Sequence, residues 1–148
     1  GLLSWTTPPT GGTTDYAVRV FFEIHANEKY DFFVREDTKL PMMMMQDAIR
    51  ATMEIMSAPS ENLSRWRSGY NIRGISFSAS ELANCIRSRN PNAEMRFIPD
   101  ERQEIADNWP EDVDDAPARN DWGWQSRFDL EELVDSMIAG VAQSSSSF

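Results

Sequence analysis

Residues 40–56 read LPMMMMQDAIRATMEIM, and this stretch decides the fold class. The continuous apolar run that ends at Met45 has the length and composition of a buried strand. Gln46 and Asp47 then open a helix, and Pro59 ends its pattern. Four consecutive methionines could instead form a soft-metal or promiscuous binding surface, but we favour a buried strand that feeds a helix. The apolar face of this helix comprises Ala48, Ile49, Thr52, Met53, Ile55 and Met56.

The residues before this unit repeat the alternation of helix and strand. Two prolines and two glycines mark residues 6–12 as a loop. Thr13 and Thr14 follow, and their hydroxyls are suited to cap the N-terminus of a helix. Residues 30–34 then have the composition of a strand. The helix between them has one buried face, formed by Ala17, Val20, Phe21 and Ile24.

The residues after this unit continue in the same way. Short strands are predicted over residues 70–72 and 95–98. The sequence Ser78-x-x-Glu81 is a capping box that starts one helix, and Asp129-x-x-Glu132 starts the last one. This last helix has apolar residues at helical spacing as far as Val141. The alternation of strands and helices predicts an α/β fold.

Composition limits the classes of function. The 148 residues suit one domain, and the formal net charge of −10 repels phosphate backbones, so we expect no nucleic-acid partner. Cys85 is the only cysteine, which excludes an internal disulfide, and we expect it to be buried. No apolar run approaches the roughly 20 residues of a membrane span. The opening residues, 1–5, lack a Met and resemble the middle of a strand, so we expect a piece of a longer protein.

Few catalytic motifs are recognisable. The seven glycines never form Gly-x-Gly-x-x-Gly, and a P-loop is absent. His25 is the only histidine, and we expect it on the surface near the end of the first helix. Asp112, Asp114 and Asp115 lack the glycine and the terminal Glu of a calcium-binding loop, so we interpret them as a solvated acidic turn. The sequence therefore predicts no metal site.

Two features do indicate a ligand. Residues 11–16 (GGTTDY) place small residues and two hydroxyls at a helix start, where backbone N–H groups and the helix dipole attract anions. A simple helix cap is the plainer interpretation. Trp109 precedes Pro110 in a polar stretch, and such a tryptophan can act as a lid over a small ligand. Trp122 and Trp124 are expected to pack the last helix onto the body.

Five segments of the chain resemble a known family and occur in the same order. They are GGTTDYA (11–17), LPMMMMQDAIRAT (40–52), YNIRGISF (70–77), RQEIADNWP (102–110) and ARNDWGW (118–124). In these segments the chain is similar to the C-terminal half of the short-chain-dehydrogenase type of L-threonine 3-dehydrogenase. This family is related to the nucleotide-sugar epimerases within the extended short-chain dehydrogenase/reductase superfamily. The resemblance covers essentially residues 1–142.

The resemblance implies a fold and an activity. The fold is the C-terminal part of an extended Rossmann-type dehydrogenase, namely its last strands and a mostly helical substrate-binding lobe over residues 1–142. Residues 143–148 are expected to form a flexible serine-rich tail. The implied reaction is the NAD-dependent oxidation of L-threonine to 2-amino-3-ketobutyrate. The family's Tyr-x-x-x-Lys pair is absent, because Tyr16, Tyr30 and Tyr70 have no lysine four positions later. We expect the pair and the NAD loop in the preceding half of a full-length protein.

Matching positions inherit expected roles from the family. Thr13 and Thr14 match the loop that holds the carboxylate of the substrate. Trp109 matches a tryptophan at the substrate cleft. Gly1 and Leu2 match the strand end that passes the nicotinamide ring, so they are the expected cofactor-binding residues, and no catalytic residue is assigned.

The resemblance also has implications for partners and compartment. It implies a homodimer as the full-length enzyme, located in mitochondria in a eukaryote and in the cytoplasm otherwise. Two alternatives stay open at this point. One is a non-catalytic binding module that kept the fold, and the other is part of a nucleotide-sugar epimerase.

Overall fold

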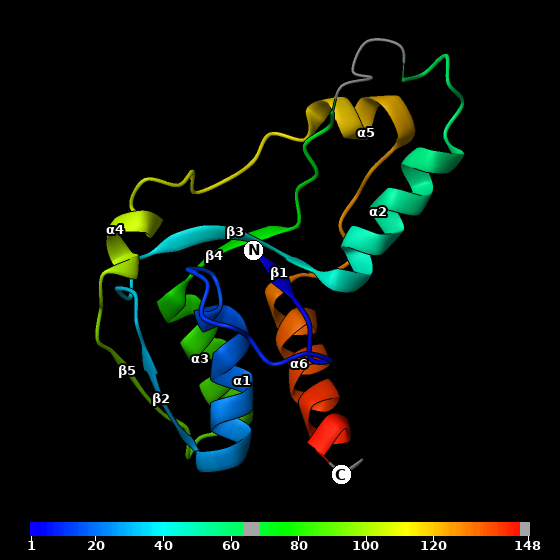
Figure 1. Cartoon of the computed structure of the whole chain (residues 1–148). Coiled ribbons are helices and arrows are strands. Elements are labelled where there is room, and N and C mark those ends of the chain that lie inside the picture. Colours follow the sequence, from blue (N-terminus) through cyan, green and yellow to red (C-terminus); the bar gives the residue numbers. More distant parts are fainter. Residues whose placement is uncertain (64–68, 146–148) are drawn as a thin grey trace.

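The computed structural model of the chain describes residues 1–63 and 69–145. The fold is mixed α/β, as predicted, and its elements alternate along the chain (Figure 1). They are β1 (Leu2–Leu3), α1 (Tyr16–Asn27), β2 (Lys29–Phe32), β3 (Lys39–Met44), α2 (Met45–Ser57), β4 (Ile75–Ser78), α3 (Ala79–Arg89), β5 (Glu94–Phe97), α4 (Arg102–Ala106), α5 (Ala116–Trp122) and α6 (Leu130–Ser145).

The methionine-rich strand β3 lies in the middle of a three-stranded sheet with the order β1-β3-β4. β1 pairs with it in parallel, with Leu2 opposite Met43, and β4 pairs with it in antiparallel fashion, with Ile75 opposite Met42. Met42, Met43 and Met44 are buried, which confirms that this run is a strand that feeds α2. A side chain on Gly74 would place its Cβ 2.3 Å from the carbonyl oxygen of Met42, so only glycine fits beside the start of β4.

A second sheet contains β2 and β5, which run parallel to each other. Helices α1, α3 and α6 lie side by side next to it (Figure 1). Their inward faces and the inner face of this sheet form one apolar core. Four buried residues of α6 belong to this core at the predicted spacing, namely Leu133, Val134, Met137 and Val141. Cys85 on α3 is also buried, as predicted.

Both predicted capping boxes are present. The Ser78 hydroxyl accepts a hydrogen bond from the backbone N–H of Glu81 at 3.1 Å, and the Glu81 carboxylate accepts one from Ser78 N–H at 2.6 Å. Asp129 and Glu132 exchange the same two bonds at 2.8 and 3.0 Å. These bonds satisfy backbone donors that have no partner within the helix, so α3 and α6 begin where the sequence predicts.

The predicted strand over residues 70–72 is wrong, and the strand is β4, three residues after that stretch. Side chains of other elements bind residues 70–73 in place of a neighbouring strand. Asp121 accepts a hydrogen bond from the Tyr70 hydroxyl at 2.6 Å, and Asp115 accepts one from the Arg73 N–H at 3.3 Å. The Trp124 indole N–H donates to the Arg73 carbonyl at 3.0 Å. Strand composition alone did not reveal these partners.

The predicted role of Trp122 and Trp124 is also wrong. Trp124 is fully buried with Met43, Ala51 and Ala118, so it packs α5 against β3 and α2 rather than α6 onto the body. The Trp122 ring meets the Tyr70 ring edge to face, with the centroids 4.6 Å apart. Gly123, whose left-handed backbone (φ 77°) ends α5, lies between the two tryptophans.

The last helix extends into the expected serine-rich tail. Helix α6 continues to Ser145, three residues past the end that we expected for the folded part, and residues 146–148 lie outside the described residues. Residues 64–68 also lie outside them. No helix in the described part of the chain is long and apolar enough to cross a membrane.

The apolar face of α2 is exposed rather than buried. Ile49, Met53 and Met56 have exposed fractions of 56%, 65% and 80%, and only Asp47 and Ala51 of this helix are buried. Figure 1 shows α2 beside the sheet and away from the bundle of α1, α3 and α6. Clustered exposed apolar side chains of this kind favour association.

The two environments of methionine give a stability test. Met53→Ala removes an exposed side chain and should change the free energy of unfolding by less than about 0.5 kcal/mol. Met137→Ala in α6 leaves a cavity in the core and should destabilise by about 2–5 kcal/mol. Chemical denaturation of both variants measures the difference. Similar losses in the two variants would contradict the assignment of α2 as a helix with a solvent-exposed apolar face.

Candidate functional site

The loop before α1 is shaped by a carboxylate. Helix α1 begins at Tyr16, and Thr13 and Thr14 lie in the turn that leads into it, so the prediction that these threonines cap the helix is wrong. The Asp15 carboxylate instead accepts hydrogen bonds from the backbone N–H groups of Gly11 and Gly12, both at 2.8 Å. Gly11 has φ 117°, a conformation that favours glycine.

This arrangement occupies part of the loop that the sequence indicated as an anion-binding site. Two successive N–H groups that point the same way form a small anion-binding concavity. In this chain the carboxylate of Asp15 already binds those two N–H groups. Thr13 and Thr14, which follow in the loop, are both partly exposed.

Thr14 lies directly against the first residue of the chain. A Cβ built on Gly1 would be 2.6 Å from Thr14 Cβ and 2.7 Å from Thr14 Oγ1, so no larger residue fits without a shift. Gly1 is held on its other side by β3, because its carbonyl accepts a hydrogen bond from Met43 N–H at 2.9 Å. Two of the residue sets predicted from sequence are thus side by side, the loop threonine and the strand end at Gly1 and Leu2.

A hollow of about 390 Å³ adjoins Gly1 and Leu2. It lies over the start of β1, β3 and α2, and its volume is within the range of small-molecule sites, about 300–1,000 Å³. None of the side chains that line it is charged. They are Gly1, Leu2, Pro41, Met42, Met43, Ala48, Thr52, Ile72, Gly74 and Val113.

Trp109 lies in the segment that connects α4 to α5. In the view of Figure 1, this segment runs from α4 to α5 above β3 and β4 without crossing either strand. The Trp109 side chain is 45% exposed, a high value for a large aromatic residue, so it is available to a ligand. Val113 in the same segment lines the hollow beside Gly1. The structure therefore brings the Trp109 segment to the hollow through Val113, whereas Trp109 itself is not among the residues that line it.

The three tyrosines of the chain all have raised pKa values. Burial raises the pKa values of Tyr16 and Tyr30 well above their ordinary value. Burial and the hydrogen bond to Asp121 raise the pKa of Tyr70 to about 12. All three are therefore protonated at neutral pH, which agrees with the absence of a Tyr-x-x-x-Lys pair from the sequence.

The acidic turn is structural and is not simply solvated. The Asp112 carboxylate binds Arg73 Nε at 2.7 Å and the Ser76 hydroxyl at 3.0 Å. Asp115 is buried and forms an ion pair with Arg119 at 3.1 Å, which corrects the prediction of a fully solvated turn. Among the described residues, no group of three or more His, Cys, Asp or Glu side chains could hold a metal ion.

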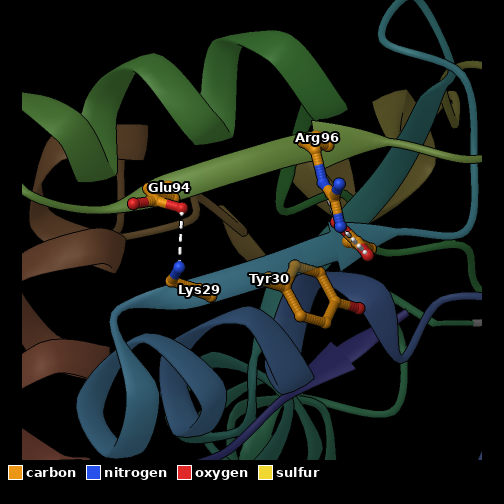
Figure 2. A pocket seen from close by; sticks show the side chains of 5 residues that line it. Lys29, Tyr30, Glu94 and Arg96 are labelled. Atoms are coloured by element: carbon orange, nitrogen blue, oxygen red, sulfur yellow. Dashed lines mark hydrogen bonds and ion pairs between the residues drawn. The ribbon is translucent and has the colours of Figure 1, made fainter.

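A second hollow, of about 240 Å³, lies on the outer face of β2 and β5 (Figure 2). Its charged side chains already pair with each other across the two strands. The Lys29 Nζ atom lies 3.1 Å from Glu94 Oε2, and the Arg96 guanidinium donates to both carboxylate oxygens of Asp31 at 2.7 and 2.8 Å. Because these charges are neutralised, this surface does not favour a charged ligand.

His25 is exposed on α1, as predicted.

Two parts of the site were missed in the sequence. The role of Asp15 has a local signal, since an acidic residue three positions after a Gly-Gly pair can fold back onto its N–H groups. The contribution of Val113 to the hollow has no such signal, because it depends on the path of the segment over the sheet.

The chain was compared with known proteins. No family model matches it. It is 45% identical over 139 residues to the mitochondrial L-threonine 3-dehydrogenase of Bos taurus, covering 93% of this chain and 37% of that protein. An uncharacterised epimerase/dehydratase of Staphylococcus haemolyticus is 35% identical over 144 residues, or 97% of this chain and 45% of that protein. The apo structure of the GalE-like L-threonine dehydrogenase from Cupriavidus necator superposes with a TM-score of 0.91 and 50% identity, covering 95% of this chain and 50% of that chain. The chain thus spans half the length of these relatives or less.

The bonds of Asp15 can be tested directly. Asp15→Ala removes both carboxylate bonds to the Gly11-Gly12 loop and should lower the free energy of unfolding by roughly 1–2 kcal/mol. Asp15→Asn keeps an acceptor oxygen and should lose less. Hydrogen exchange at the Gly11 and Gly12 amides should accelerate in the alanine variant. Unchanged exchange at both amides would show that the carboxylate does not hold this loop.

Proposed function

The chain belongs to the epimerase/dehydratase-type short-chain dehydrogenases and corresponds to the C-terminal part of their L-threonine 3-dehydrogenases, and from this premise we propose that it forms the substrate-binding lobe of an NAD-dependent enzyme that oxidises L-threonine. In this proposal the full-length protein is a homodimer. It is mitochondrial if its source is a eukaryote, as the name of the bovine relative states for that protein, and cytoplasmic otherwise.

The contact between Thr14 and Gly1 carries this proposal. It joins the loop assigned to the substrate with the strand end assigned to the cofactor, beside an apolar hollow. Thr13 and Thr14 hold the substrate carboxylate with hydroxyl and backbone donors at the start of α1. Hydrogen bonds to an ionised group are stronger than bonds between neutral groups, so this anchor fixes the position of the hydroxyl carbon.

The residues near Gly1 fit one end of NAD. The hollow beside Gly1 and Leu2 is lined by uncharged residues, which suits the nicotinamide ring. These residues include no charged side chain for the pyrophosphate, and no glycine-rich loop occurs in the chain, so the preceding half of the full-length protein would supply both. When bound, NAD accepts the hydride. The part of Gly1 and Leu2 is to bind and orient the ring.

Trp109 completes the site in this proposal. Its exposed side chain covers the bound amino acid and excludes water, which favours transfer of a hydride over side reactions. The three neutral tyrosines of the chain move no proton. The Tyr and Lys that run the proton chemistry belong to the preceding half.

Substitution of the two threonines tests the binding role. Thr13→Val and Thr14→Val in the full-length enzyme each delete a charge-assisted hydrogen bond but keep the shape of the side chain. The Michaelis constant for threonine should therefore rise about ten-fold per variant, with NAD affinity nearly unchanged. Trp109→Ala should lower turnover as well. Steady-state kinetics with either substrate varied measures all three.

The same variants separate binding from a purely structural role. If the threonines only support the turn before α1, the variants should melt earlier and bind threonine normally. That result would refute the assignment of Thr13 and Thr14 as substrate residues. A preference for a sugar nucleotide over threonine would favour the epimerase alternative instead.

The 148-residue chain alone gives a further test. It contains neither the Tyr-x-x-x-Lys pair nor the glycine-rich loop, so we expect no threonine-dependent formation of NADH. Absorbance at the NADH band with threonine and NAD present measures this. Activity of the purified chain would overturn the proposal that the chemistry resides in the preceding half.

A further inference from the structure

The segment that carries Trp109 is held at both ends by an arginine. We call residues 107–112 the Trp109 strap. Its first residue, Asp107, pairs with Arg35, and its last residue, Asp112, pairs with Arg73. Both arginines belong to other parts of the fold, after β2 and before β4. Trp109 and Pro110 lie between the two ion pairs, so each pair fixes one end of the strap.

The pair at the first end is part of a larger network. Arg35 donates two hydrogen bonds to the Asp107 carboxylate, at 2.7 and 3.1 Å. The Gln103 amide also donates to Asp107, at 2.7 Å, and its oxygen accepts bonds from Arg35 N–H at 2.7 Å and from the Thr38 hydroxyl at 3.0 Å. Gln103 and Thr38 are buried. The network therefore connects Asp107 to the turn between β2 and β3.

The turn at Trp109 continues directly from this network. The Asp107 N–H donates to the Gln103 carbonyl at 2.9 Å, and the Trp109 N–H donates to the Ala106 carbonyl at 3.1 Å. A shift of Asp107 therefore moves the backbone of Trp109. The Arg35 guanidinium and then the Gln103 amide hold the pKa of Asp107 below its ordinary value. Asp107 is thus ionised at neutral pH, where the pair is at full strength.

The pair at the second end places the strap on the sheet. Arg73 Nε donates to Asp112 at 2.7 Å, and the same oxygen accepts bonds from the Ser76 hydroxyl at 3.0 Å and from Val113 N–H at 2.8 Å. Ser76 belongs to β4, which pairs with β3. The next residue, Val113, lines the hollow beside Gly1. The second anchor thus sets the strap over the side of the sheet that carries the candidate site.

We propose that Arg35 and Arg73 are positioning residues for threonine oxidation, which hold the Trp109 strap so that the indole covers the substrate. This inference rests on the proposed function, because it assigns Trp109 a place over the amino acid. Neither arginine touches the substrate. Arginine suits the role because its planar fork binds a carboxylate in one orientation, whereas a lysine ammonium does not fix direction. Both anchors lie outside the apolar core, so their loss should loosen the strap without unfolding the lobe.

A double-mutant cycle in the full-length enzyme tests the proposal. Arg35→Gln and Arg73→Gln should each lower turnover about five-fold or more, since a small misplacement of a positioning group reduces rate strongly. NAD affinity should stay unchanged. In a Trp109→Ala background, the same substitutions should have no further effect, because the group that they position is gone. Arg35→Lys keeps the charge and should restore little.

Arg96→Gln is the matched control. Arg96 makes the same kind of bidentate pair on the outer face of β2 and β5, where its guanidinium binds Asp31 rather than a residue of the strap. This variant should keep full turnover. The fluorine NMR line of Trp109 in 5-fluorotryptophan-labelled enzyme, assigned with Trp109→Phe, should shift or broaden in the Arg35 and Arg73 variants and not in the Arg96 variant.

The outcomes separate this inference from the proposed function. Equal losses of turnover with and without Trp109 would overturn it, because the arginines would then act by another route. If Trp109→Ala left turnover unchanged, the lid role in the proposed function would fail. The fluorine line alone would then decide whether the arginines position Trp109, and an unchanged line in both variants would overturn that as well.

Discussion

The pairing of β3 with a strand on each side is the constraint on which the rest of the structure depends. After the exposed Lys39, β3 has to be apolar because β1, β4, α2 and the core surround it, and its three methionines at 42–44 meet that need. The parallel pairing with β1 brings Gly1 to the edge of the hollow. The antiparallel pairing with β4 sets Gly74 against the backbone of β3. It also places Ser76 of β4 where its hydroxyl donates to Asp112. Both sides of the candidate site are thus placed by one strand.

Much of this arrangement could be predicted from the sequence, because it depends on local signals. The apolar run of β3 and both capping boxes require only neighbouring residues, and they were predicted correctly. The errors have a common cause. Residues 70–72 have strand composition, but Asp115, Asp121 and Trp124 bind the segment 70–73 from distant parts of the chain. The burial of Trp124 against α2 has the same origin. Partners that come from far along the chain decide such segments, and their identity is not a property of the local sequence.

The loop before α1 shows a different limit. Its composition correctly indicates a turn rich in free N–H groups, and two threonines beside it are natural caps. The threonine hydroxyls do not cap α1, because the N–H groups of Ala17 and Val18 bind the backbone carbonyls of Thr14 and Asp15 at 3.2 and 3.1 Å. The Asp15 carboxylate binds the N–H groups of Gly11 and Gly12, so these two donors are unavailable to other anions. The candidate site residues Thr13, Thr14 and Trp109 could be proposed from the sequence by resemblance, whereas their supports, Asp15 and the two arginines, became visible only in three dimensions.

The use of arginine follows from the same need to fix loops. The chain has more acidic than basic residues, so a carboxylate on a loop has few cationic side chains available to fix its position. Arg35, Arg73 and Arg96 each bind a carboxylate of another element or segment at 2.7 Å, and Arg35 also pairs with Asp37 at 3.3 Å. Exposed ion pairs contribute little to stability, typically about 0.2–1 kcal/mol, and their effect here is therefore better understood as orientation. Arg96 orients no segment with a ligand-facing group, so its pair with Asp31 only connects β5 to β2 on the surface of the sheet. Where the segment carries Trp109, the same chemistry determines the position of a side chain that the proposed reaction needs.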